Sequence, residues 1–282
     1  MTTPTTDPIL EVRGLEVTLG HGRRATRILN GIDLSLQRGS TVALVGESGS
    51  GKSTIAKTII GIHQADEGSI RFAGTELVGA DRGTRRSVRR RIQLIPQNPY
   101  SSLDPRRTIG QTLAEAIDPV LGRVGRHRQQ ISSALAMVAL DDAAIGRYPH
   151  EFSGGQRQRI AIARALATDP DVVIADEITS ALDVSTQAEI LVLLARLREE
   201  LQLTVLFISH NLAVVSQICD DVIVLLNGDV VEAGPVGSVF SHPASEYTQT
   251  LVDSVPGGTA FTLALAESAP LPSTPDSTGG TP

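Results

Sequence analysis

One glycine-rich segment constrains the fold of this chain more than any other feature. Residues Gly46–Ser53 read GESGSGKS and match the pattern G-x-x-x-x-G-K-[ST]. They follow the apolar run Thr41–Val45, which is typical of a strand buried on both faces, and a segment with helical spacing runs from Lys52 to about Ile62. A strand, a glycine-rich turn and a helix in this order predict an α/β fold built around a phosphate-binding loop.

The residue types of this loop suit a nucleoside triphosphate. Glycines let backbone N–H groups curl around phosphates, Lys52 places a cation against the β- and γ-phosphates, and Ser53 offers a hydroxyl to Mg²⁺. The following helix adds the positive end of its dipole. A glycine-rich turn that matches by chance is the alternative, but four fixed positions in the right context favour the phosphate site. The predicted contacts are Gly46, Glu47, Ser48, Gly49, Ser50, Gly51, Lys52, Ser53 and Thr54.

A second apolar run, Val172–Ala175, ends in two acidic residues. Asp176 can orient Mg²⁺ through its water shell, and Glu177 can polarise an attacking water. An apolar strand that ends in acids is common and has no function by itself. The phosphate loop earlier in the chain favours the functional interpretation, so the pair predicts hydrolysis of the bound nucleotide.

The other segments alternate between strand and helix patterns, which implies a mainly parallel sheet with helices on both faces. Ile9–Leu19 and Ile28–Gln37 alternate apolar with polar residues and predict half-exposed antiparallel strands. From about residue 108 to 168 helical spacing dominates, which predicts a helical insertion. Further strands are expected at Ser69–Phe72, Ile92–Ile95, Thr204–Ile208 and Val222–Leu226, and further helices at Thr186–Leu201 and Leu212–Ile218.

Composition argues against several classes of protein. The chain has 25 Lys and Arg against 31 Asp and Glu, a net charge of −6, which does not suit a general nucleic-acid binder. The arginine-rich Arg82–Arg91 lacks aromatic residues that could stack bases, so a solvated helix face is favoured over a nucleic-acid patch. The one cysteine, Cys219, permits no internal disulfide and is interpreted as a small core residue on a helix face. No apolar run approaches the roughly 18 residues that span a bilayer, so any spanning is expected from another chain.

Ser153-Gly154-Gly155-Gln156 opens the predicted helix Gln156–Leu166. A serine and two glycines at a helix N-terminus can bind an anion. A simple N-cap with a tight turn is an equally good interpretation of this segment by itself. Since the chain has one phosphate loop, a second phosphate-binding helix end suggests that two chains share each nucleotide.

These motifs together resemble the nucleotide-binding subunit of an ATP-binding cassette (ABC) transporter. Phe152-Ser-Gly-Gly-Gln resembles the diagnostic signature of that family, Gln97 fits its Q-loop, Ser180-Ala-Leu-Asp183 its D-loop, and His210 its switch histidine. The resemblance covers about Ile9 to Val255. It implies a P-loop NTPase core with a mainly parallel sheet, an antiparallel β subdomain and an inserted α-helical subdomain.

The family pattern implies two such domains, identical or not, packed head to tail around ATP. Each ATP would lie between the phosphate loop of one chain and Ser153, Gly154, Gly155 and Gln156 of the other, with Asp183 nearby. Glu177 would act as the catalytic base, Gln97 would contact Mg²⁺ or the attacking water, and His210 would touch the γ-phosphate. Taken by itself, His210 would be a strand-end histidine with a structural hydrogen bond. The implied Mg²⁺ contacts are Ser53, Gln97 and Asp176.

Two further segments resemble a subfamily of importers for oligopeptides, dipeptides or nickel. Gln97–Arg106 reads QNPYSSLDPR and resembles the extended Q-loop of that subfamily, and His242–Leu251 reads HPASEYTQTL and is similar to its C-terminal H-P-x-x-x-Y-T-x-x-L stretch. The second segment is also a proline-started helix, expected to pack Tyr247 and Leu251 on the core without a chemical role.

The resemblance implies an ATPase on the cytoplasmic face of the cell membrane. Its partners would be a second ABC ATPase subunit, two transmembrane permease subunits and, indirectly, an extracytoplasmic solute-binding protein, with no nucleic acid. Peptides are the leading solute, and a nickel or oligosaccharide importer is the alternative. A soluble non-transport ABC ATPase and a regulatory cassette without turnover are less favoured alternatives.

Two positions depart from the family pattern. Ile178 follows Glu177 where the family usually has proline, which would fix φ, so the loop that carries the base is expected to be looser. Val17–His21 contains no aromatic residue to stack on adenine, and Leu19 or His21 would have to substitute. The expected layout is a flexible tail at 1–8, a nucleotide-binding domain at 9–255 with a helical subdomain at about 98–168 and a C-terminal extension at about 235–255, and a disordered tail at 256–282.

Overall fold

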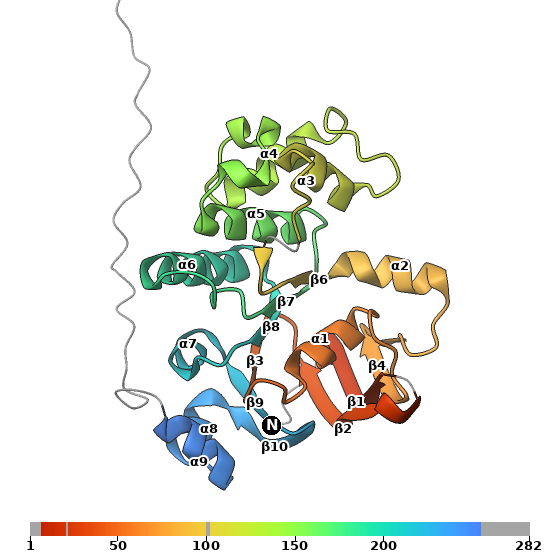
Figure 1. Cartoon of the computed structure of the whole chain (residues 1–282), viewed down its shortest axis with the longest axis vertical. Coiled ribbons are helices and arrows are strands. Elements are labelled where there is room, and N and C mark those ends of the chain that lie inside the picture. The colour runs from red at the N-terminus through yellow and green to blue at the C-terminus, as the bar shows by residue number, and fades with distance from the viewer. Residues whose placement is uncertain (1–6, 21, 100–101, 255–282) are drawn as a thin grey trace, which may run out of the picture.

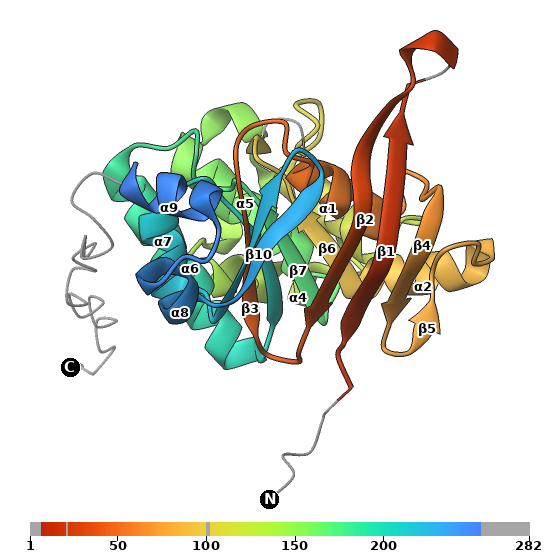
Figure 2. The same ribbon diagram turned by 90° about the horizontal axis from the view of Figure 1, so that it is seen from below.

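The structure is a computed structural model that describes residues 7–20, 22–99 and 102–254. Its elements form two sheets and a group of helices, as Figures 1 and 2 show from two sides. The predictions for residues 1–6 and 256–282, and those that involve His21, Tyr100 and Ser101, lie outside the described residues.

The central sheet has six strands in the order β10-β9-β3-β8-β7-β6. Its strands are β3 (Thr41–Val45), β6 (Ile92–Ile95), β7 (Val172–Asp176), β8 (Thr204–Ile208), β9 (Asp221–Leu226) and β10 (Asp229–Pro235). All neighbouring pairs are parallel except β9 and β10, which are antiparallel. Every residue of β3, β7 and β8 is buried, as the continuous apolar runs predict for a sheet covered on both faces.

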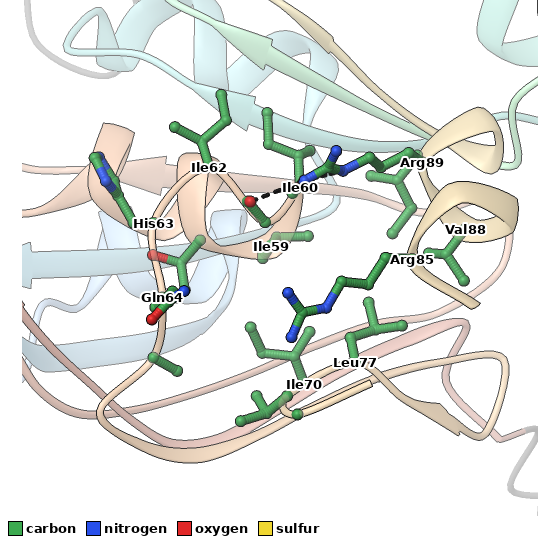
Figure 3. Close-up of a pocket in the computed structure, with 16 residues that line it drawn as sticks. Ile59, Ile60, Ile62, His63, Gln64, Ile70, Leu77, Arg85, Val88 and Arg89 are labelled. Carbon is green, nitrogen blue, oxygen red and sulfur yellow. Dashed lines mark hydrogen bonds between the residues drawn. The ribbon is translucent and has the colours of Figure 1, made fainter. Parts of the chain in front are cut away.

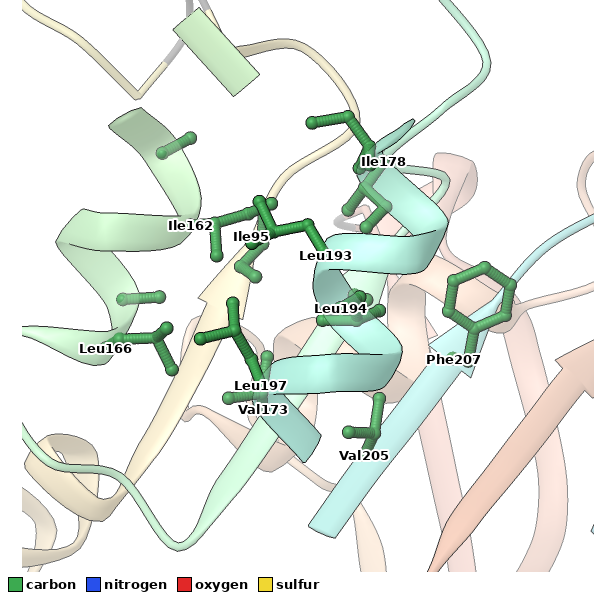
Figure 4. Packing of buried hydrophobic residues seen from close by; sticks show 14 of the residues in the cluster. Ile95, Ile162, Leu166, Val173, Ile178, Leu193, Leu194, Leu197, Val205 and Phe207 are labelled. Carbon is green, nitrogen blue, oxygen red and sulfur yellow. The ribbon is translucent and has the colours of Figure 1, made fainter. Parts of the chain in front are cut away.

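Successive residues of these strands pack into two different hydrophobic cores, because side chains alternate between the faces of a sheet. Val173 and Phe207 belong to the core under the helices, whereas Val172 and Leu206 belong to the core under the second sheet. Figure 4 shows the first core, where side chains of two helices, among them Ile162 and Leu197, meet over β7. These helices are α5 (Gly154–Leu166) and α6 (Val184–Leu201).

The second sheet has the order β2-β1-β4-β5 and is antiparallel. It consists of β1 (Leu10–Leu19), β2 (Thr26–Leu36), β4 (Glu67–Phe72) and the two-residue β5 (Thr75–Glu76). Buried and exposed residues alternate along β1 and β2, and the buried ones pack against helix α1 (Lys52–Ile59). The antiparallel β subdomain expected from the alternating pattern is therefore confirmed.

The region from residue 102 to 171 is helical wherever the structure describes it as regular, and Figure 1 shows it as the group at the top. It contains α3 (Ile109–Ile117), α4 (Arg128–Met137) and α5, with short 3-10 turns at Asp142–Gly146 and Pro149–Glu151. Thr108 caps α3 and Ser153 caps α5, each in a capping box with a glutamine three residues later. The predicted helical insertion is confirmed in the described residues.

The helices α2 (Arg82–Arg91) and α7 (Leu212–Ile218) begin and end where the sequence predicts. The arginines of α2 do more than face solvent, since Arg89 donates to the carbonyls of Ile60 and Gly61 and Arg91 pairs with Asp171. Cys219 lies just beyond α7 rather than on its face, and packs partly buried against the core.

Three elements at the C-terminal side were not predicted as they occur. β10 and α8 (Val236–Ser241) were missed, and α9 (Glu246–Asp253) begins after Ser245 rather than at the proline. Ser245 caps α9 by accepting a hydrogen bond from the N–H of Tyr247, which explains the later start. Among residues 7–20, 22–99 and 102–254, no helix has both the length and the hydropathy required to cross a membrane.

Candidate nucleotide-binding site

The phosphate loop connects β3 to α1, and glycine is required at both of its ends. Gly46 has φ +143° and Gly51 has φ +109°, a region that other residues rarely adopt. A Cβ atom on Gly46 would overlap the carbonyl oxygen of Leu225, and one on Gly51 would lie 2.6 Å from Cδ2 of Leu29. No side chain caps the N-terminus of α1, so its first N–H groups remain available to phosphate oxygens.

Lys52 lies across this loop. Its ammonium donates to the carbonyls of Gly46 (2.8 Å) and Glu47 (2.6 Å) and to Oγ of Ser50 (3.3 Å). The residue is 5% exposed, and burial lowers the pKa of its ammonium, while nearby Glu177 and the acid before it oppose that shift. The loop thus orients a buried cation at the place where the sequence predicts the β- and γ-phosphates.

Ser53 and Asp176 meet beside the lysine, with Oγ of the serine donating to Oδ1 of the aspartate over 3.2 Å. Asp176 is 7% exposed, and burial raises the pKa of its carboxyl group. A hydroxyl and a carboxylate are the oxygen ligands that Mg²⁺ prefers, and Mg²⁺ takes its remaining ligands from phosphates and water. The described residues contain no group of three His, Cys, Asp or Glu side chains that could hold a metal.

Glu177 is the meeting point of three segments. Nε2 of Gln97 donates to Oε2 of Glu177 (2.7 Å) and to Oγ of Ser180 (3.2 Å), and Nδ1 of His210 lies 3.5 Å from Oε1 of Glu177. These residues follow β6, β7 and β8, three neighbouring parallel strands, so their carboxyl ends bring the side chains to one edge of the sheet. The side chain of His210 is 63% exposed.

The residue after Glu177 is held by packing. Glu177 has φ +47°, and its N–H donates to the carbonyl of Ile208 over 3.0 Å. The side chain of Ile178 is buried at the end of the helix-covered core, where Figure 4 shows it beside α6. A buried isoleucine therefore anchors the position that proline usually occupies in the family.

Ser153, Gly154, Gly155 and Gln156 form a second group around the start of α5. Oγ of Ser153 accepts from the N–H of Gln156 (3.2 Å), and Oε1 of Gln156 accepts from the N–H of Ser153 (3.0 Å). Asp183 caps α6 by accepting from the N–H and the hydroxyl of Thr186, both at 2.9 Å. The hydrogen bond from the hydroxyl of Ser185, together with these two, lowers the pKa of the Asp183 carboxyl group to about 2. Gly155 packs directly against Thr186, so this group and Asp183 are neighbours.

The structure therefore divides the predicted residues into two groups. The phosphate loop, Asp176, Glu177, Gln97 and His210 converge, whereas Ser153–Gln156 and Asp183 gather at the start of α5 and α6. In Figure 1, α5 lies in the helical group at the top, and α1, which carries the phosphate loop, lies beside the antiparallel sheet.

One residue near the site was missed. Tyr247 packs partly buried against the core, as the sequence predicts, but its hydroxyl also accepts a hydrogen bond of 3.0 Å from the N–H of Glu47 in the phosphate loop. The H-P-x-x-x-Y stretch identifies Tyr247 by its resemblance to the subfamily, but it does not predict the contact with the phosphate loop. On the adenine side, Leu19 ends β1 half-buried, and His21 lies outside the described residues.

A cavity of about 420 Å³ lies away from both groups, between the end of α1, β4 and α2. Figure 3 shows apolar side chains such as Ile59, Ile70 and Val88 around it, with the guanidinium of Arg85 directed inward. None of the predicted site residues lines this cavity.

Comparison with known proteins places the chain in a family. A family model described as "ABC transporter" matches residues 29–180. The di/tripeptide transport ATP-binding protein DppF of Pseudomonas aeruginosa is 45% identical over 248 residues, which cover 86% of this chain and 76% of that protein. The oligopeptide transport ATP-binding protein OppF of Escherichia coli is 44% identical over 235 residues, which cover 83% and 70% of the two chains.

Solved structures agree with this result. The dimeric post-hydrolysis structure of the ATP-binding cassette MJ0796 with ADP and Pi has a TM-score of 0.71 and 29% identity, and covers 80% of this chain and 98% of that one. CbiO1 of Clostridium perfringens, part of the ABC transporter complex cbiONQ, has a TM-score of 0.73 and 28% identity, and covers 89% and 97%. The chain described here belongs to the ABC transporter family and is one of its ATP-binding cassettes, an ATPase.

Proposed function

We propose that this chain is the ATP-hydrolysing subunit of a membrane importer for dipeptides and oligopeptides. The observation that carries the proposal is the 44–46% identity to ATP-binding proteins named for di/tripeptide, dipeptide and oligopeptide transport. The segments Gln97–Arg106 and His242–Leu251, which resemble the same importer subfamily, support it. A nickel or oligosaccharide importer is the alternative solute class.

We assign hydrolysis to the group formed by the phosphate loop, Asp176, Glu177, Gln97 and His210. Lys52 binds the β- and γ-phosphates, while Ser53, Asp176 and Gln97 hold Mg²⁺. Glu177 polarises the attacking water, and His210 contacts the γ-phosphate. The hydrogen bonds from Gln97 and the contact with His210 support this assignment, because both side chains already lie at the carboxylate that must orient the water.

The second group of residues is assigned to a facing subunit. The start of α5 presents helix N–H groups, and Gly154 leaves open space beside them, since the nearest atom to a Cβ there would be Cδ2 of Leu182 at 3.7 Å. We place Ser153–Gln156 of one subunit on the nucleotide held by the phosphate loop of the other. The dimeric structure of the similar cassette MJ0796 supports this arrangement.

The permease contact is assigned to the side of the molecule next to Gln97. A groove of about 520 Å³ lies there between the end of α1 and α5, lined by Leu94, Pro96, Ser102 and Ala161, and Ile62 at its rim is 61% exposed. We place this face against two transmembrane permease subunits at the cytoplasmic side of the membrane, with a solute-binding protein beyond it.

The domain layout is part of the same proposal. We assign residues 9–255 to a nucleotide-binding domain, with its helical subdomain at about 98–168 and its C-terminal extension at about 235–255.

The Glu177→Gln variant tests the catalytic base. The variant should lose steady-state ATP turnover by about 10²–10⁴-fold, the usual contribution of a general base, and should accumulate as an ATP-bound dimer on size-exclusion chromatography. Glu200→Gln, at an exposed carboxylate that pairs with Arg196 near the end of α6, is the matched control and should turn over normally. Turnover of Glu177→Gln within threefold of the unmodified protein would refute the assignment of the base.

A mixing experiment tests the shared site. Lys52→Ala removes the cation of a subunit's own phosphate loop, and Gly154→Asp places a carboxylate against the nucleotide held by its partner. Each variant should be inactive by itself, but a mixture contains dimers with one intact composite site and should regain turnover. A mixture that stays inactive, although mixed dimers are shown to form, would exclude the shared site.

The solute class is tested in the assembled transporter. The chain is reconstituted with its permeases and solute-binding protein in proteoliposomes, and ATP turnover is measured with dipeptides, longer peptides, Ni²⁺ or oligosaccharides. Stimulation by peptides is expected, whereas stimulation by Ni²⁺ or by sugars in their place would assign the chain to the alternative class.

A further inference from the structure

Helix α9 contacts the phosphate loop through one hydroxyl group. The phenolic oxygen of Tyr247 accepts the N–H of Glu47 over 3.0 Å. The carbonyl of Gly46, which belongs to the same peptide group as that N–H, accepts the ammonium of Lys52 over 2.8 Å. A single peptide group therefore bridges the tyrosine at one end and the phosphate-loop lysine at the other.

Contacts at both ends of α9 fix the position of the tyrosine. Glu232 of β10 accepts hydrogen bonds from the N–H groups of Ala244 (2.9 Å) and Ser245 (3.1 Å) just before α9, and these bonds help to lower the pKa of its carboxyl group. Val252 of α9 is buried in the helix-covered core, and Leu251 packs against that core. Since both ends of α9 are tied to the protein, the hydroxyl of Tyr247 is held where it meets the loop.

The same side of the protein supports the loop at a second point. The N–H of Gly228, in the turn between β9 and β10, donates to the carbonyl of Ser50 over 3.1 Å. The phosphate loop is therefore attached at Glu47 and at Ser50 to segments that follow the catalytic strands in sequence. Packing of an aromatic ring would explain a phenylalanine at position 247 equally well, but it does not explain a hydroxyl at hydrogen-bonding distance from the loop.

We propose that Tyr247 is a positioning residue for nucleotide binding, which fixes the Gly46–Glu47 peptide and, through it, the ammonium of Lys52. Hydrogen bonds at the two ends of one peptide group polarise each other, so the bond from Tyr247 strengthens the carbonyl of Gly46 as an acceptor and holds the lysine in place. Burial raises the pKa of the phenol, which keeps the hydroxyl neutral. The inference rests on the proposed role of this loop as the nucleotide site.

The test compares Tyr247→Phe with Thr250→Val. The first variant removes the hydroxyl and keeps the ring, while the second removes a hydroxyl of the same helix that donates to the carbonyl of Glu246 within the helix. Binding of Mg·ATP to the purified chain is measured by titration calorimetry, and KM and kcat are measured on the dimer.

Tyr247→Phe should bind Mg·ATP about threefold to tenfold more weakly, as expected for one lost hydrogen bond, with a matching rise in KM and a kcat within twofold. Hydrogen exchange at the Glu47 amide should accelerate, while exchange within α9 stays unchanged. Thr250→Val should match the unmodified protein in both respects. Glu232→Ala, which releases the start of α9 without touching Tyr247, should also weaken Mg·ATP binding, and it tests the inference even if Tyr247→Phe folds poorly.

Equal affinity of Tyr247→Phe and the unmodified chain for Mg·ATP would overturn the inference and leave the proposed function intact. Equal losses in Tyr247→Phe and Thr250→Val would also overturn it, because they would trace the effect to the helix and not to the hydroxyl. Failure of the unmodified chain to bind Mg·ATP would instead contradict the proposed nucleotide site itself.

Discussion

Gly155 lies where α5 meets the first turn of α6, and substitution there tests how closely the two helices pack. A Cβ atom at this position would overlap Cγ2 of Thr186. The threonine is not free to rotate away, because its hydroxyl donates to Oδ2 of Asp183 over 2.9 Å. Gly154 is the natural comparison, since a Cβ there would meet only Cδ2 of Leu182, at an ordinary 3.7 Å.

The expected difference in stability between the two alanine variants follows from these contacts. Replacing glycine by alanine in a helix stabilises by about 0.5–1 kcal/mol, and this gain is common to both positions. Overpacking costs about 1–3 kcal/mol and applies to Gly155 alone of the two. Gly155→Ala should therefore be less stable than Gly154→Ala by about 1–3 kcal/mol. At about 2–4 °C per kcal/mol for a domain of this size, its Tm should be lower by roughly 2–12 °C.

The assay is thermal unfolding followed by circular dichroism, without nucleotide, because ligand binding and dimerisation would shift Tm by mass action. A third substitution isolates the contact: Thr186→Ser removes Cγ2 and keeps the hydroxyl that bonds Asp183. In the Thr186→Ser background, Gly155→Ala should cost little or should stabilise. Equal Tm values for Gly155→Ala and Gly154→Ala, or no rescue by Thr186→Ser, would refute the packing argument.

Three further outcomes are expected. Phe207 is 1% exposed in the central sheet, so Phe207→Ala should cost about 3–5 kcal/mol in urea unfolding, and a cost below about 1 kcal/mol would contradict its place in the core. Burial and the neighbouring Asp220 raise the pKa of the Cys219 thiol, so its alkylation by iodoacetamide at pH 8 should be at least about tenfold slower in the folded chain than in urea. Equal rates would show that the thiol is accessible. Ser53→Ala should raise the Mg²⁺ concentration for half-maximal ATPase activity by about tenfold, which corresponds to a loss of roughly 1.4 kcal/mol in Mg²⁺ binding. Ser53→Thr keeps the hydroxyl and should stay near normal. An unchanged Mg²⁺ requirement in Ser53→Ala would exclude Ser53 as a ligand.

The sequence was most informative where structure is determined locally. The strand Thr41–Val45 and the helix Arg82–Arg91 have the predicted bounds, because a continuous apolar run and an aspartate N-cap act within a few residues. The strand Asp229–Pro235 was missed because it lies at the edge of the sheet and none of its residues is fully buried, which leaves no apolar pattern. The dipeptide Asn227-Gly228 before it is a hairpin signal that could have revealed it.

Contacts between distant segments could not be predicted in the same way. The spacing of Gln97, Glu177 and His210 along the chain does not say that β6, β7 and β8 are neighbours in the sheet. That order follows from pairing over the whole core, and it is what brings the three side chains together. The contact of Tyr247 with the phosphate loop has the same origin, since α9 reaches Glu47 only after β9 and β10 have added the far edge of the sheet.

The carboxylate of Glu177 connects two other segments of the chain. Its Oε2 atom accepts a hydrogen bond from Gln97, and its Oε1 atom faces His210, so each carboxylate oxygen already has a partner. Because an ionised carboxylate offers about four acceptor positions, a water can bind to Glu177 while both partners stay in place. Gln97 follows β6 and precedes the helical group that begins with α3. The bond between Gln97 and Glu177 therefore joins the proposed catalytic carboxylate to the part of the chain that connects β6 with α3, the first helix of that group.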